Sequence, residues 1–202
     1  MPVIAHPRQR RIVCCRKAGV SMLFCERLPA SVLNSVPREQ RRRECTKILA
    51  DFATSFPSVK YRPLLDINLI NAQAVTTLAA RYVNLYGGLV FHPGIGEQSL
   101  LIVLLHETGH HLSPGRRSSI NQTLACECEA DHWAITEGAD LLARQSGRVL
   151  QLAVAVQELS CIHSLAQRAS QCLAPLRCWS GDWSARKQAL LRQIPARGDC
   201  CD

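Results

Sequence analysis

The sequence predicts an α+β fold that is mostly helical, with a small sheet beside one of its helices. Apolar residues recur at helical spacing over residues 37–56, and the aliphatic block Leu100–Leu105 lies inside a second helix expected over 97–112. Short stretches rich in β-branched and aromatic residues, at 59–70 and 89–91, are bounded by proline or glycine and indicate short strands. A helical body with few strands follows.

The other helices are expected over residues 71–86, 119–142, 148–173 and 184–193. Asn71 can cap the first of them, and the pair Gly87-Gly88 ends it. Ser119, followed three residues later by Gln122, forms a capping box that opens the second.

Length and composition limit the class of protein. A chain of 202 residues suits one domain with tails, and 47% hydrophobic with 20% charged residues is ordinary globular usage, which excludes wholesale disorder and fibrous repeats. No apolar run approaches the roughly 20 residues of a membrane-spanning helix. The first 25 residues also lack the apolar core of a secretory signal. We therefore expect no membrane span and a cytoplasmic location.

The net charge of +8 is concentrated near the N-terminus, where residues 1–60 hold twelve Lys or Arg against four Asp or Glu. Such a basic segment attracts nucleic acid or anionic lipid. Because no aromatic residue interleaves these arginines, a solvated arm is favoured, with nucleic-acid binding as the weaker alternative. We divide the chain into a basic lead-in (1–33), a folded domain (34–175) and an extension containing Cys and Trp (176–202).

The eleven cysteines are an odd number and contain no Cys-x-x-Cys zinc pattern. Without a visible secretory signal, reduced thiols in a reducing compartment are the expected state. A disulfide among the five cysteines beyond residue 160 stays open.

The segment His106-Glu107-Thr108-Gly109-His110 carries the strongest chemical signal. From the composition, His-Glu-x-x-His is expected by chance only about 0.01 times in this chain. Positions four apart on a helix differ by roughly 40° around its axis, so both imidazoles leave one face and can hold one zinc ion. Glu107 lies about 100° further round, where it can act on a water beside the metal. A structural zinc site has no use for that carboxylate.

A plainer interpretation is an amphipathic helix with a solvated polar face. However, these polar residues directly follow Leu100–Leu105 in a helix that must be largely buried. Burying them without a shared partner is costly, and a bound metal removes that cost.

A third ligand is expected downstream, because catalytic zinc sites usually have three protein ligands. Glu127 and Asp131 are four residues apart on an expected helix, so Glu127 can bind the metal while Asp131 accepts the outer N–H of a ligand histidine. Glu129 points roughly 200° away from Glu127 and is the poorer ligand.

These motifs resemble those of the gluzincin metallopeptidases, and most closely the group of CAAX prenyl proteases and the heat-shock membrane protease. The resemblance rests on Asn71–Ala74, Gly87–Val90, His106–His110 and the Glu-x-x-Ala-Asp-like run Glu127–Asp131. It implies a zincin-like domain over 34–175, with Zn²⁺ held by two histidines and the first glutamate of that run. It also implies that an extended peptide lies along the strand at 89–91.

By this resemblance His106, His110 and Glu127 are the zinc ligands and Glu107 is the catalytic base. His163 faintly resembles an oxyanion-stabilising residue, with His132 and Tyr86 as other candidates. The function expected is a zinc metallopeptidase of the endopeptidase type, acting on a peptide or protein substrate. The alternative is a DNA- or protein-binding regulator that retains a structural or vestigial zinc site.

Overall fold

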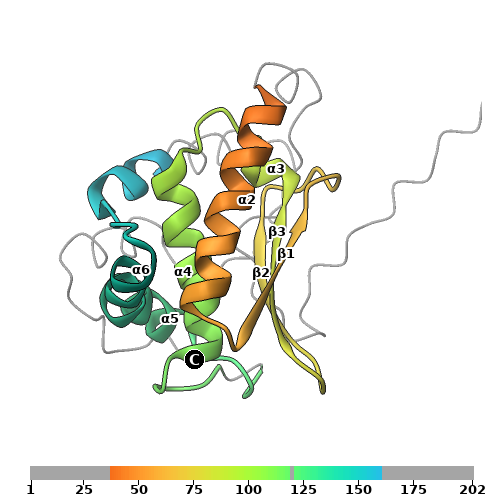
Figure 1. Cartoon of the computed structure of the whole chain (residues 1–202). Coiled ribbons are helices and arrows are strands. Elements are labelled where there is room, and N and C mark those ends of the chain that lie inside the picture. Colours follow the sequence, from red (N-terminus) through yellow and green to blue (C-terminus); the bar gives the residue numbers. More distant parts are fainter. Residues whose placement is uncertain (1–36, 119–120, 161–202) are drawn as a thin grey trace, which may run out of the picture.

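The computed structural model describes residues 37–118 and 121–160. In this part of the chain, helices pack on one face of a three-stranded sheet (Figure 1). The helices are α2 (Arg38–Ser55), α3 (Gly87–Val90), α4 (Glu97–Leu112), α5 (Glu127–Trp133) and α6 (Ala139–Ser146), with a π-helical turn η1 (Ala134–Gly138) between the last two. The strands are β1 (Val59–Leu64), β2 (Ala72–Thr76) and β3 (Arg81–Tyr86). The predicted α+β fold, mostly helical with a small sheet, is confirmed.

Helix α4 lies in the middle of this arrangement, between the sheet and the pair α5 and η1 (Figure 1). Leu100–Leu105 is buried on every side, so the helix has no solvent-facing stripe in its centre. The prediction for residues 97–112 is confirmed along its whole length. A functional group on this helix is therefore held by packing on all sides.

The first turn of α4 is capped from a distant part of the chain. Gly96, its N-cap residue, has no side chain to offer. Instead Oε2 of Glu158 accepts hydrogen bonds from the backbone N–H of Gly96 (3.0 Å) and of Ser99 (3.1 Å) and from the Ser99 hydroxyl (2.6 Å). A carboxylate at this end also interacts favourably with the helix dipole.

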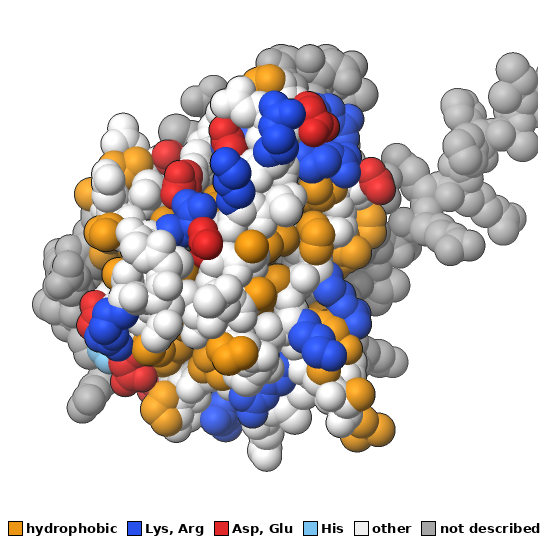
Figure 2. All heavy atoms as spheres, in the orientation of Figure 1, with side chains coloured by type: hydrophobic (Ala, Val, Ile, Leu, Met, Phe, Trp, Pro, Cys, Tyr) orange, Lys and Arg blue, Asp and Glu red, His pale blue; other side chains and the backbone are white. Residues whose placement is uncertain are grey.

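Helix α2 confirms the pattern predicted for residues 37–56. Its buried face consists of Cys45, Ile48, Leu49 and Phe52. The Phe52 ring packs edge-on against that of Tyr61 on β1, with 5.5 Å between centroids, which joins the helix to the sheet. Arginines at the N-terminal end of α2 alternate with acidic side chains, as Figure 2 shows, and Arg43 lies 3.7 Å from Glu39.

The sheet has the order β1-β3-β2, with β1 parallel and β2 antiparallel to the central β3. On the face toward the helices Ala72, Ala74, Val83 and Leu85 are fully buried. Strand β2 is the edge that packs against α4. This contact brings a strand backbone next to the middle of the helix.

The helix predicted over 71–86 is wrong, because this segment is the β2–β3 hairpin. Residues 81–86 alternate between buried and more exposed positions, which is the period of a strand. Between the strands the hydroxyl oxygen of Thr77 accepts hydrogen bonds from the N–H groups of Ala79 (3.3 Å) and Ala80 (3.1 Å). That side-chain turn favours a hairpin over a helix.

The strand predicted at 89–91 is also wrong, since Gly87–Val90 is the buried turn α3. A Cβ on Gly87 would lie 2.0 Å from the carbonyl oxygen of Leu65, so only glycine allows this approach. Of the segment 59–70, only Val59–Leu64 forms a regular strand.

Downstream, the helix predicted over 119–142 is present from Glu127 on as the unbroken run α5, η1 and α6, with a π-helical turn in its middle. Helix formation begins at Glu127, with Cys126 as its N-cap, so the capping box at residues 119–122 does not open it; Ser119 itself lies outside the described residues. Residues 152–160 are helical, as predicted for part of 148–173, while the rest of that helix and the one at 184–193 lie outside the described residues.

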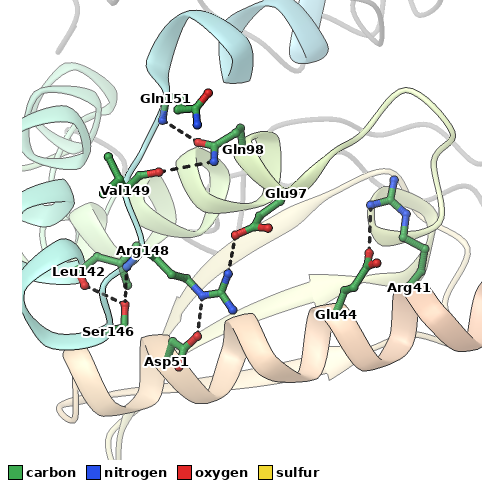
Figure 3. Close-up of polar contacts among 10 residues, drawn as sticks. All are labelled: Arg41, Glu44, Asp51, Glu97, Gln98, Leu142, Ser146, Arg148, Val149 and Gln151. Carbon is green, nitrogen blue, oxygen red and sulfur yellow. Dashed lines mark hydrogen bonds and ion pairs between the residues drawn. The ribbon is translucent and has the colours of Figure 1, made fainter.

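Arg148 fastens the segment after α6 to two other helices (Figure 3). Its guanidinium pairs with Asp51 on α2, at 2.5 Å, and with Glu97 in the first turn of α4. Gln98 adds hydrogen bonds to the backbone of Val149 and Gln151. The N-terminal end of α4 is thus held from two sides.

Within residues 37–118 and 121–160, no helix combines the length and apolarity that a membrane span needs. The predicted basic lead-in (1–33) and C-terminal extension (176–202) lie outside the described residues.

Candidate metal centre

His106 and His110 converge on one point from the same face of α4. Their Nε2 atoms are 3.0 Å apart and their ring centroids 4.6 Å apart. Only 3% of His106 and 2% of His110 is exposed. The pairing predicted from the i, i+4 spacing is therefore present, in a site largely shielded from water.

Each imidazole is oriented through its other nitrogen. His106 Nδ1 lies 2.8 Å from Oδ1 of Asp131, and His110 Nδ1 lies 2.8 Å from the carbonyl oxygen of Ala125. Both partners accept hydrogen bonds, so each Nδ1 carries the proton. In the neutral rings both Nε2 atoms then present lone pairs, which is the state in which histidine binds a metal.

Glu127 supplies a third donor to the same point. Its Oε2 lies 3.3 Å from His106 Nε2, and its Oε1 lies 3.6 Å from His110 Nε2. Four-coordinate zinc with bonds of about 2.0–2.1 Å holds its ligand atoms about 3.3 Å apart. The three donors match this spacing, and two imidazoles with one carboxylate are a donor set that zinc accepts.

Glu127 is the exposed member of this cluster. The Glu127 side chain is 38% exposed, whereas the two histidine side chains are 4% and 2% exposed. Three protein donors with solvent on one side are typical of a catalytic zinc site, whereas structural sites are usually closed by four.

Glu129 points elsewhere, as its position on the helix predicted. Its carboxylate lies against Gly115, where an added Cβ would come within 2.0 Å of Oε2. No ion pair or hydrogen bond joins it to either histidine in the described residues.

Glu107 lies beside the histidines and is fully buried. One of its carboxylate oxygens and one ring nitrogen from each of His106 and His110 all fall within 4.8 Å of one another. Its Oε2 accepts a hydrogen bond from the backbone N–H of Ala74 on β2, at 2.6 Å. The edge strand therefore fixes the carboxylate next to the candidate metal position.

Gly109, between the two histidines, sets how closely α5 approaches α4. A Cβ at this position would lie 2.7 Å from the carbonyl oxygen of Ala130 and 3.1 Å from its Cα. Both atoms are backbone, so a larger residue would force the helices apart. The short distance brings Glu127 and Asp131 within reach of the histidines.

Two of the three candidates for an oxyanion-stabilising residue, Tyr86 and His132, lie within the described residues. The Tyr86 hydroxyl donates to Gln73 Oε1, at 2.9 Å. His132 Nδ1 is buried without a hydrogen-bond partner among the described residues. His163 lies outside the described residues.

Two contributions to the site carry no signal in the sequence, because both come from backbone groups. The carbonyl of Ala125 orients His110, and the N–H of Ala74 holds Glu107. Any residue other than proline supplies an N–H, so residue type does not reveal them.

The cysteines correct the expectation of reduced thiols. Cys126 and Cys128, on either side of Glu127, are disulfide-bonded. Cys45 on α2 is free and buried, and burial raises the pKa of its thiol to about 11, an effect that the nearby Arg42 partly offsets. An odd total of cysteines is compatible with some paired and some free thiols, but the count does not reveal which cysteines are paired.

Comparisons with known proteins leave the chain without an assigned relative: no protein-family model matches it, and neither the curated proteins nor the solved structures contain a significant match.

Proposed function

We propose that this protein is a zinc-dependent metallopeptidase of the gluzincin kind, with His106, His110 and Glu127 as metal ligands and Glu107 as general base. Zinc is the metal that the donor set favours, and a peptide or protein is the substrate. The proposal joins the sequence motifs with the geometry of α4, α5 and β2.

One observation carries it above the others: the Nε2 atoms of His106 and His110 face each other at 3.0 Å, with Glu127 oxygens 3.3 and 3.6 Å away. Because both Nδ1 atoms hold their protons for other acceptors, the converging atoms are electron-pair donors that repel one another. A divalent cation at their meeting point turns this repulsion into coordination.

A zinc ion held by His106, His110 and Glu127 would supply Lewis acidity for a scissile carbonyl and for a water molecule. Glu107 accepts a proton from the attacking water and passes it to the leaving amine. Its burial and its hydrogen bond to the Ala74 N–H keep the carboxylate aimed at the site. Asp131 and the Ala125 carbonyl keep both imidazoles in the tautomer that leaves Nε2 available.

An extended substrate that reaches Glu107 passes along β2, the sheet edge beside α4. Sheet edges bind extended peptides through main-chain hydrogen bonds. Strand β2 thus takes the role of substrate-binding edge that the sequence suggested for residues 89–91, because those residues belong to the buried turn α3 and its C-cap.

The test is the Glu107→Gln variant of the full chain. Glutamine keeps the size of the side chain and an oxygen for the Ala74 N–H but cannot take a proton. We expect stoichiometric zinc in both proteins by metal analysis, and a roughly 10²- to 10⁴-fold lower rate of peptide cleavage in the variant. A purified wild-type protein that holds no zinc, or a variant that cleaves at the wild-type rate, would rule the proposal out.

The alternative, a regulator with a structural or vestigial zinc site, gains no specific support. Its basic lead-in lies outside the described residues, and the described arginines of α2 are partly paired with Glu39 and Glu44. A purely structural zinc site would also leave the carboxylate of Glu107 without a chemical role.

The cytoplasmic location stays a prediction from the sequence. The disulfides of Cys126 and Cys128 favour an oxidising compartment, because disulfides rarely persist in the cytosol.

A further inference from the structure

We propose that Cys126 and Cys128 are positioning residues for the metal ligand Glu127, and that the metal site assembles fully only while both are oxidised. This inference rests on the proposed function, since it concerns the same zinc site. It adds a redox condition to metal binding that the motifs do not contain.

The two cysteines enclose the ligand in the sequence Cys126-Glu127-Cys128, and each is disulfide-bonded. Cys126 is also the N-cap residue of α5 and is 3% exposed. Disulfide bonds therefore tether the residues directly before and after the carboxylate that lies beside His106 and His110.

The same segment sets the orientation of one histidine. The Ala125 carbonyl accepts the Nδ1–H of His110, while the Ala125 N–H donates to the His110 carbonyl at 2.7 Å. The Cys126 N–H donates to the carbonyl of Arg116, at 2.9 Å. Loosening residues 125–128 would thus move Glu127 and release the partner of His110 together.

No side chain caps the N-terminus of α5. At its other end the helix continues without a break through η1 into α6, because Ala134, Gly138 and Ala139 keep helical backbone angles. The first turn of α5 is therefore its least supported part. Two acidic residues in the first turn, Glu127 and Glu129, suit the helix dipole, but one of them is turned toward the histidines.

The chemistry needs an external dithiol. In each exchange a thiolate of the dithiol attacks a disulfide sulfur, and its second thiol releases the protein thiol. The dithiol loses two electrons and two protons and closes to its own disulfide, while the protein gains two thiols. Each cysteine is then free of its tether.

The experiment measures zinc affinity by competition with a chromophoric chelator in three states of the full chain. These are the oxidised wild type, the wild type reduced with dithiothreitol that is then removed under nitrogen, and the oxidised Cys126→Ser and Cys128→Ser variants. Cys45→Ala is the matched control, because Cys45 is already a free thiol in α2. Circular dichroism checks that each protein is folded.

We expect zinc to bind about 10- to 100-fold more weakly to the reduced protein and to both serine variants, the size found when groups that orient metal ligands are lost. The Cys45→Ala protein should bind zinc like the oxidised wild type. If a serine variant fails to fold, the reduced wild type still gives the comparison.

Equal affinity in the oxidised and reduced proteins would overturn this inference and leave the metallopeptidase intact. Tighter binding after reduction, with thiolate-to-metal absorption when Co²⁺ replaces zinc, would also overturn it, since the cysteines would then be ligands. An oxidised wild type that binds no zinc would instead overturn the proposed function itself.

Discussion

The backbone N–H of Ala74 and the carboxylate of Glu107 are joined by a 2.6 Å hydrogen bond, although 33 residues separate them. The edge strand of the sheet therefore holds the side chain that the motif assigns to proton transfer. A strand backbone cannot swing away as a side chain can, so the contact orients Glu107 whether or not a substrate is bound.

Replacing Ala74 by proline removes this N–H and should lower the rate of peptide cleavage. A hydrogen bond to a charged group contributes about 1.5–3 kcal/mol, which corresponds to a roughly 10- to 100-fold lower kcat. Zinc content should not change, because the Ala74 N–H donates to Glu107, which is not one of the proposed metal ligands. Steady-state kinetics with metal analysis checks both.

Thr76→Pro is the control for this variant. Thr76 lies two residues further along β2, so its N–H also faces away from β3 without reaching Glu107. An equal loss of kcat in the two proline variants would show that damage to the strand, not the lost hydrogen bond, is responsible.

The choice between two glutamates on α5 is a second prediction. Glu127→Gln should lose zinc, because an amide oxygen replaces an anionic donor 3.3 Å from His106. Glu129→Gln should retain it, since that carboxylate packs against Gly115. Metal content after dialysis separates the two, and zinc retained in Glu127→Gln but lost in Glu129→Gln would reverse the assignment.

Gly109 gives a prediction in which two effects have opposite signs. Alanine has a higher helix propensity than glycine by about 1 kcal/mol, so Gly109→Ala alone should stabilise α4. The added Cβ, however, would meet the backbone of Ala130 at 2.7 Å. We expect the clash to dominate, with a lower melting temperature and weaker zinc binding.

If Gly109→Ala raised the melting temperature and left zinc affinity unchanged, the close contact of α4 and α5 would not be needed. Thermal unfolding with and without chelator provides the measurement.

The stability of the metal-free protein should fall as the pH drops below about 6.5. Burial lowers the pKa of His92 from its usual 6.5, and His92 Nδ1 accepts the Gly94 N–H at 3.0 Å, which a protonated nitrogen cannot do. Burial also lowers the pKa of His111. Below pH 6.5 these two histidines are protonated in the unfolded chain but still neutral in the folded protein, so acid favours unfolding.

Thermal melts with chelator from about pH 8 to about pH 5 test this dependence. In His92→Asn the side-chain oxygen can still accept the Gly94 N–H but does not titrate. The decline toward acid pH should be shallower in this variant, and an unchanged slope would assign the effect to other histidines.

The cluster of candidate metal ligands could be foreseen because its parts are local. His106, Glu107 and His110 share two turns of one helix, and Glu127 and Asp131 share another, so helical spacing alone predicts which side chains point together. What spacing does not predict is the distance between the two helices. That distance depends on Gly109, whose role becomes visible only when α5 is placed beside it.

The sheet was foreseen less well, because strand pairing is not local. Residues 71–86 contain good helix-capping and helix-ending residues, yet the segment pairs as β2 and β3, and β3 pairs with β1 more than 20 residues earlier in the chain. Tertiary pairing overrides local propensity in such segments. The mistake at 89–91 has another cause, since Gly87 and Gly88 allow a tight buried turn rather than end a helix.

Because Glu158 caps the first turn of α4, that helix is completed only after a residue much later in the chain has folded onto it. The helix that carries both histidines starts at Glu97, but the carboxylate that caps it arrives about 60 residues later in synthesis. Until Glu158 has been synthesised and has docked, its carboxylate cannot accept from the first N–H groups of α4, and these groups bond to water instead. A metal captured before residue 158 has docked would therefore meet a helix that still frays at its beginning.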